Sequence, residues 1–195
     1  MIPQLNTLIM LCACALPVWL LLRGGWLLLR RPRRRPKPLR EIAMGVFAVF
    51  MAGVMYMVLE GEWQSPPAML RSALSRLQTG DRIRLRPLHT IGPQVAALPS
   101  LDSVTQLLGN TLLFAPWGFF LPLLWPRFRK LLTMVGMALL LTCSIEFTQL
   151  FINRFVEVDD VLLNFLGSML GAGVWRSLHR CFPHLDAPLT EAAKE

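Results

Sequence analysis

Acidic, amide and basic side chains are concentrated around the short link Asn153–Glu157, which joins two hydrophobic stretches long enough to cross a bilayer. Carboxylates in or beside a membrane are costly, so each of them needs a partner or a function. Their oxygens could hold a divalent cation, and an arginine among them could hold a phosphate. The candidate site residues are Glu146, Gln149, Arg154, Asp159, Asp160 and Asn164, with Asn110 from an earlier hydrophobic stretch.

Residue spacing places these side chains on common helix faces. Glu146 and Gln149 are three residues apart and share one face of a helix. In the next stretch a polar stripe continues into a G-x-x-x-G pair, the spacing that lets another helix approach closely. The lower half of that helix is therefore predicted to pack tightly while its upper half offers a carboxylate and an amide. The stripe consists of Asp160, Asn164, Gly167 and Gly171.

Two interpretations of this polar layer remain open. In the structural one, Arg154 pairs with Asp159 or Asp160 and Gln149 pairs with Asn164, so that the layer only joins helices. In the functional one, the same groups bind a ligand with an anionic head. No cluster of histidine and cysteine ligands is present, so we expect no metal centre and no cofactor.

The composition is that of an integral membrane protein. Hydrophobic residues make up 54% of the chain and charged residues only 16%, whereas soluble domains carry about 25% charged residues. Several hydrophobic runs approach the roughly 20 residues that span hydrocarbon as a helix. We predict an all-α membrane fold with about five transmembrane helices. The predicted spans are Leu5–Leu22 (extending toward Leu29), Ile42–Leu59, Val104–Trp125, Leu131–Ile152 and Val158–Leu178.

The net charge of +8 comes from one segment. Arg23–Arg40 contains eight basic residues and no acidic one, and the rest of the chain is balanced. A basic block between two spans sets topology and contacts anionic lipid, so we expect no nucleic-acid partner. Placing it in the cytoplasm puts the N-terminus outside and the C-terminus inside. The clusters Pro126–Lys130 and Arg176–Arg180 then also fall inside, and the polar layer lies at the outer leaflet.

The long connection between residues 60 and 103 carries two further patterns. Leu70, Leu74 and Leu77 recur at helical spacing and predict a short interfacial helix. Arg82–Arg86 alternates like a strand but has no evident sheet to join, so we interpret it as an extended loop.

Three ordered blocks of the sequence resemble those of the VanZ-like family. The first runs from Asn110 to Pro122 as N-x-x-x-F-x-P-x-G-F-x-x-P. The second is Ser144–Gln149, with its glutamate and glutamine. The third runs from Arg154 through Asp159 and Asp160 to the asparagine and glycine that follow.

This resemblance implies a multi-span protein of the bacterial cytoplasmic membrane with a role in the cell envelope. The family is named for a protein associated with teicoplanin resistance, and its members have no settled biochemical activity. The implied division is a first span and basic link (1–41), a second span and external loop (42–103), a VanZ-like core (84–178) and a cytoplasmic tail (179–195).

We therefore expect a protein that binds or shields an anionic envelope lipid, linked to glycopeptide resistance, and we assign it no enzymatic activity. One alternative is an intramembrane enzyme acting on a lipid phosphate, with Glu146 and Asp160 as base or ligands and Arg154 gripping the phosphate. Another is a structural subunit that meets a membrane protein partner, or a second copy of itself, through Gly167 and Gly171.

Overall fold

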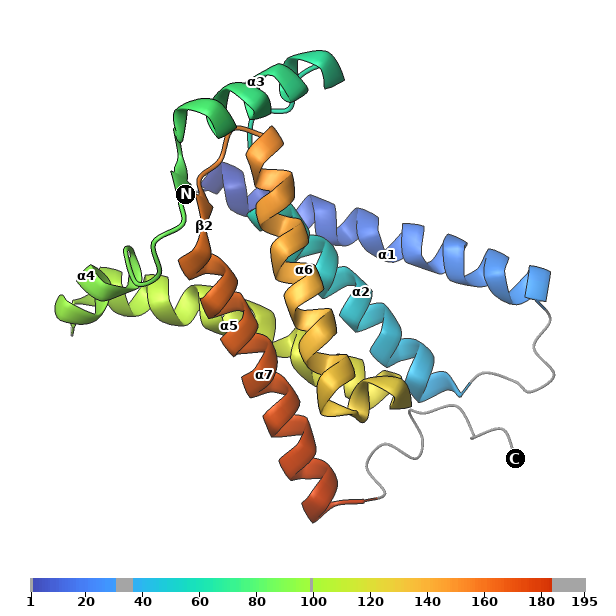
Figure 1. Ribbon diagram of the computed structural model, residues 1–195. Helices are drawn as coiled ribbons and strands as arrows, with labels where there is room; N and C mark the ends of the chain where they lie inside the picture. The colour runs from blue at the N-terminus through green and yellow to red at the C-terminus, as the bar shows by residue number, and fades with distance from the viewer. Residues whose placement is uncertain (1, 31–36, 99, 184–195) are drawn as a thin grey trace.

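The computed structural model describes residues 2–30, 37–98 and 100–183 (Figure 1). Most of the predicted proline-rich basic link and most of the predicted tail lie outside these residues. Seven α-helices are found in the described part of the chain, with a 3₁₀ turn and two short strands. The elements are α1 (Ile2–Arg30), α2 (Pro38–Val58), α3 (Pro66–Thr79), β1 (Ile83–Arg84), α4 (Ile91–Ala96), α5 (Leu101–Leu124), η1 (Pro126–Arg129), α6 (Leu131–Phe151), β2 (Val156–Glu157) and α7 (Val158–Cys181).

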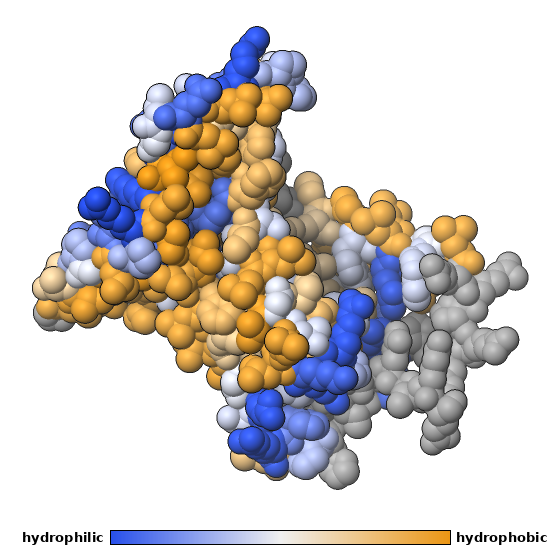
Figure 2. Space-filling view, in the orientation of Figure 1, coloured by the Kyte–Doolittle hydropathy of each residue, from blue (hydrophilic) through white to orange (hydrophobic). Residues whose placement is uncertain are grey.

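Four of these helices, α2, α5, α6 and α7, are long and apolar enough to cross a membrane. The all-α membrane fold predicted from composition is thus confirmed. α1 is 29 residues long, and the apolar stretch Cys14–Leu29 forms its C-terminal part. Hydrophobic residues cover much of the visible face of the long helices, and hydrophilic residues gather near α3 and near the end of α7 (Figure 2).

Helices α5 and α7 pack against each other backbone to backbone. A Cβ atom added at any of three glycines would overlap a carbonyl oxygen of the facing helix. The G-x-x-x-G pair of α7 is thus used within this chain, as small residues are at close helix crossings. The three contacts are Gly118 with Ser168, Gly167 with Thr111, and Gly171 with Ala115.

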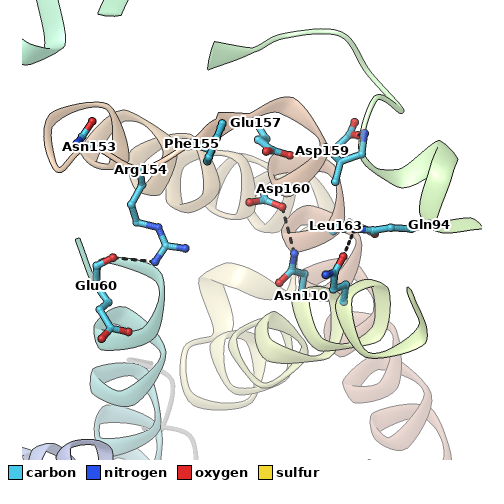
Figure 3. Close-up of a pocket in the computed structure, with 12 residues that line it drawn as sticks. Glu60, Gln94, Asn110, Asn153, Arg154, Phe155, Glu157, Asp159, Asp160 and Leu163 are labelled. Atoms are coloured by element: carbon cyan, nitrogen blue, oxygen red, sulfur yellow. Dashed lines mark hydrogen bonds between the residues drawn. The ribbon is translucent and has the colours of Figure 1, made fainter. Parts of the chain in front are cut away.

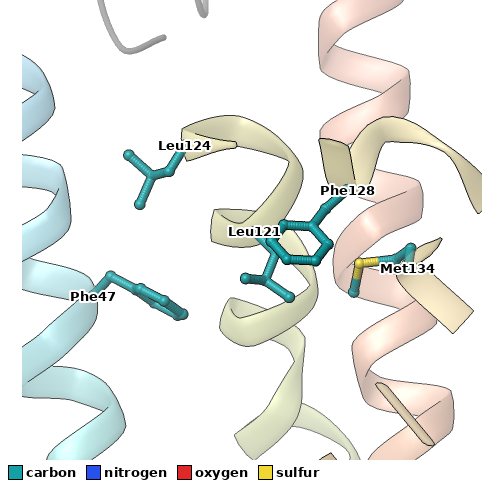
Figure 4. Packing of buried hydrophobic residues seen from close by; sticks show 5 residues of the cluster. All are labelled: Phe47, Leu121, Leu124, Phe128 and Met134. Atoms are coloured by element: carbon teal, nitrogen blue, oxygen red, sulfur yellow. The ribbon is translucent and has the colours of Figure 1, made fainter. Parts of the chain in front are cut away.

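A hydrophobic cluster closes the end of the bundle where α5 ends and α6 begins (Figure 4). Phe47 from α2 stacks on Phe120 with ring centroids 5.4 Å apart. Leu124 is fully buried, and Phe128 of η1 lies in the same cluster. This packing fixes one end of the helices and leaves the polar residues at the other.

The region between α2 and α5 contains two helices, α3 and α4, and the strand β1. The predicted helix through Leu70, Leu74 and Leu77 forms as α3, with Ala73 and Arg76 buried and the three leucines exposed. The interpretation of Arg82–Arg86 as a loop without a sheet was wrong, because Ile83 and Arg84 pair in parallel with β2. The partner strand is only two residues long, so it has no alternation by which the sequence could reveal it.

Candidate functional site

The seven candidate residues lie at the end of the bundle where α5 and α7 begin and α6 ends. Two adjoining cavities meet there, and they share Asn110, Arg154 and Asp160 as lining residues. We call the larger one, of about 460 Å³, the outer pocket (Figure 3). We call the smaller one, of about 130 Å³, the inner chamber. The outer pocket is lined by Glu60, Thr90, Gln94, Gln106, Asn110, Asn153, Arg154, Phe155, Glu157, Asp159, Asp160 and Leu163.

Asp159 holds the loop that precedes α4. Its Oδ1 accepts the backbone N–H of Leu88 at 2.6 Å, and its Oδ2 accepts those of Thr90 at 2.7 Å and Ile91 at 3.0 Å. The side chain is only 2% exposed. Backbone donors thus compensate the burial of this carboxylate. Asp159 organises one wall of the outer pocket.

Glu157, which the sequence analysis left out of the site, has a similar role. Its Oε1 accepts from Arg84 at 2.9 Å and its Oε2 from the hydroxyl of Thr90 at 2.6 Å. Its position among other acidic residues could have suggested that it belongs to the site. Its partners, Arg84 and Thr90, are far away in the sequence and could not have been identified from it. Because both of its oxygens accept hydrogen bonds and Arg84 balances its charge, this carboxylate contributes little net negative charge to the pocket.

Arg154 does not pair with Asp159 or Asp160 in the described part of the chain, contrary to the structural interpretation. Its Nη1 donates instead to the backbone carbonyls of Glu60 at 2.9 Å and Met57 at 3.3 Å (Figure 3). These carbonyls lie at the C-terminal end of α2, where helices leave acceptors unsatisfied and where a positive charge is favourable. Arg154 therefore ties the α6–α7 link to α2 and places its guanidinium at both cavities.

Arg76 caps α6 in a similar way, and the sequence analysis missed it. The side chain is 4% exposed and donates to the carbonyls of Leu150 at 2.6 Å and Gln149 at 3.3 Å. It also reaches the carbonyls of Arg82 and Arg154. Burial, followed by the nearby charge of Arg82, lowers the pKa of Arg76, while Asp81 acts in the opposite direction. The carbonyls stabilise the buried cation against this cost.

Glu146 and Gln149 share a face of α6, as predicted, and both are buried. Glu146 Oε2 accepts the backbone N–H of Glu157 at 2.8 Å, and Gln149 Nε2 donates to the carbonyl of Val58 at 2.8 Å. The amide nitrogen of Gln149 therefore donates to Val58 and not, as had been expected, to Asn164. Glu146 Oε1 and Gln149 Oε1 are buried and accept no hydrogen bond from the described residues. Each such acceptor costs about 1–3 kcal/mol if nothing else satisfies it.

Asp160 and Asn164 complete the layer from α7. Asp160 Oδ1 accepts from Asn110 Nδ2 at 3.2 Å, which links α7 to α5 (Figure 3). Asn164 is buried and lines the inner chamber with Asp160. Six of the seven candidates line this chamber, and Asp159 lies in the outer pocket instead.

The chemistry of the two cavities is that of polar recognition. No group of three or more metal-ligating side chains occurs in the described residues. Asp159 and Glu157 are already engaged with donors of the chain. The remaining groups are amides, one guanidinium and the carboxylates of Glu60, Glu146 and Asp160. Such a set can bind a group that carries both donors and acceptors.

The family described as VanZ/LLP1 matches residues 46–179, which is more than half of the chain. The match includes the second half of α2 and the whole polar layer, and so extends upstream of the three sequence blocks. No curated protein and no solved structure gives a significant match. The ordered blocks, the apolar helices and the extent of this match together lead to one conclusion: the chain belongs to the VanZ/LLP1 family.

Proposed function

We propose that this protein binds the phosphate-bearing head of an envelope lipid in the outer pocket. The observation that carries the proposal is a polar cavity of about 460 Å³ at the end of membrane-spanning helices. Exposed leucines of α5, Leu108 and Leu112, lie on the same helix as the pocket residues Gln106 and Asn110. Acyl chains can therefore lie along α5 while the head enters the pocket.

Arg154 supplies the positive charge for the phosphate. Both of its hydrogen bonds to the chain use Nη1, which leaves donors on Nη2 and Nε. Guanidinium groups bind phosphate oxygens through parallel donors. Gln106 lines the same pocket and adds a further amide donor, because only its Oε1 is used by Gln94. Arg84 and backbone N–H groups compensate the carboxylates of Glu157 and Asp159, so that Glu60 and Asp160 are the carboxylates beside which Arg154 would hold the phosphate.

The biological consequence follows from the orientation set by the basic clusters. With the N-terminus outside, the pocket opens at the outer leaflet, where cell-wall precursors are displayed. A protein that occupied or shielded such lipids would lower the access of glycopeptides to them. This supports a role in teicoplanin susceptibility as part of the same proposal.

The two alternatives have less support. Catalysis on a lipid phosphate would need an activated nucleophile or a metal, and the described residues hold no group of metal ligands. Docking of a partner through Gly167 and Gly171 is disfavoured because α5 already covers both glycines.

The test is lipid retention by native mass spectrometry of protein released from nanodiscs. Gln106→Trp should fill the pocket, because Gln106 is exposed and lies on its wall. Thr105→Trp is the matched control, because Thr105 is the exposed neighbour and does not line the pocket. We expect lipid retained by the wild type and by the control to be lost in Gln106→Trp. Equal retention in all three would refute binding in the outer pocket.

A further inference from the structure

The inner chamber contains two acceptors that the described chain leaves unsatisfied. Glu146 is 5% exposed and Gln149 is 4% exposed, and both side chains line this cavity. Glu146 Oε1 and Gln149 Oε1 accept no hydrogen bond from the described residues. Buried acceptors in native proteins nearly always have a donor, so the chamber is built to receive one.

The identity of these atoms as acceptors is fixed by their other contacts. Gln149 Nε2 donates to the carbonyl of Val58 at 2.8 Å, so the amide cannot be turned to place its nitrogen in the chamber without losing that bond. Glu146 Oε2 is used by the backbone N–H of Glu157 at 2.8 Å, which leaves Oε1 as the available oxygen.

The charges around the chamber favour a positively charged donor. Glu146 and Asp160 line it with one basic residue, Arg154. The guanidinium of Arg154 is held at Met57 and Glu60 by their carbonyls rather than at Glu146. Two carboxyl groups thus line the chamber with a single guanidinium, and a cationic donor that entered it would meet both of them.

We propose that the inner chamber is an ammonium subsite, which takes the primary amine of the lipid head whose phosphate lies in the outer pocket. The two cavities adjoin through Asn110, Arg154 and Asp160, so an amine and a phosphate separated by a short linker reach both. Glu146 Oε1 and Gln149 Oε1 accept from the amine, and Asp160 contributes charge. This inference rests on the phosphate site of the proposed function and names a different preferred head from the wall precursor considered there: a zwitterionic aminoethyl phosphate, in preference to a purely anionic head.

The first test compares lipids that differ only in the head. Wild-type protein in nanodiscs containing equal amounts of phosphatidylethanolamine and phosphatidylglycerol is released and its retained lipid identified by native mass spectrometry. We expect roughly a tenfold preference for phosphatidylethanolamine, the factor that about 1.4 kcal/mol of differential binding gives. Glu146→Gln should abolish the preference while retaining lipid, because it replaces the free acceptor and the charge but spares Arg154.

A second measurement does not depend on the bilayer. Thermal stabilisation of the detergent-purified protein by O-phosphoethanolamine should exceed that by glycerol 3-phosphate in the wild type and equal it in Glu146→Gln. Thr148→Val, on the same helix and lining neither cavity, is the control and should behave as the wild type.

The outcomes separate the two proposals. Lipid retained by the wild type without a head preference would overturn the ammonium subsite and leave the outer pocket standing. A preference that persists in Glu146→Gln would also overturn it. Absence of any retained lipid in the wild type would refute the proposed function itself, and the subsite with it.

Discussion

Asp159 and Thr90 are joined by a 2.7 Å hydrogen bond from the backbone N–H of Thr90 to Oδ2 of the aspartate, although they are 69 residues apart in the chain. The same carboxylate also binds Leu88 and Ile91. The first turn of α7 therefore determines where the loop before α4 lies. That loop supplies Thr90 to the outer pocket, so the shape of the pocket depends on an aspartate that is itself fully occupied.

We predict that Asp159→Asn loosens this loop. The substitution removes one of the two acceptor oxygens and the charge, which should lower the free energy of unfolding by about 2–3 kcal/mol. Trypsin cleavage after Arg84 should become faster as the loop opens. Asp81→Asn is the control, because Asp81 is exposed on the same segment. Equal cleavage rates in both variants would contradict the role of Asp159.

Gly171→Ala should separate α5 from α7, because its Cβ would overlap the carbonyl oxygen of Ala115. Overpacking of this kind costs about 1–3 kcal/mol. Gly173→Ala, two residues further along the same helix, meets nothing within 4 Å and should leave stability unchanged or slightly increased. Thermal unfolding in detergent measures both, and similar melting temperatures for the two variants would rule out the close crossing.

Arg76→Met should destabilise the end of α6. The change removes the donor of the buried Leu150 carbonyl, whereas the carbonyl of Gln149 keeps the backbone N–H of Arg154, and the cost is about 1–3 kcal/mol. Arg71→Met on the exposed side of α3 is matched in chemistry and should have little effect. If the two variants unfolded at the same temperature, the cap would contribute nothing to stability.

Arg23 and Glu41 should show energetic coupling. Their side chains form a bidentate pair at 2.8 Å between α1 and α2, and they are 16% and 18% exposed. A double-mutant cycle with Arg23→Met and Glu41→Gln should give about 1–2 kcal/mol, because the pair is charge-assisted and largely shielded from water. Additive single effects would show that this ion pair does not hold α1 to α2.

The hydrophobic pattern predicted the long helices within a few residues. The predicted spans Ile42–Leu59, Val104–Trp125, Leu131–Ile152 and Val158–Leu178 correspond to α2, α5, α6 and α7. The prediction of these spans succeeded because the thickness of the bilayer fixes the length of an apolar run. A span can therefore be located without knowing which helices it contacts. Spacing also predicted that Glu146 and Gln149 share a face and that the glycines of α7 face a helix.

The partners of the polar residues could not be predicted in the same way. Arg154, Arg76 and Gln149 all donate to backbone carbonyls, which every residue carries and which therefore leave no signature in a sequence. The expectation that opposite charges nearby would pair failed for Arg154 because helix ends offered unsatisfied acceptors at closer range. The sequence left the end of the first span open between Leu22 and Leu29, and α1 continues past Gly24 to Arg30.

The crossing of α5 and α7 has a consequence for how the chain is made. α6 lies between these helices in the sequence, so α5 is synthesised and inserted well before its partner exists. Until α7 has been synthesised, Thr111 and Ala115 of α5 lack their contacts with Gly167 and Gly171. Asn110 likewise lacks its hydrogen bond to Asp160. The polar layer can therefore assemble only after α7 has been made, and a nascent chain stopped before residue 158 lacks Asp159, Asp160 and Asn164.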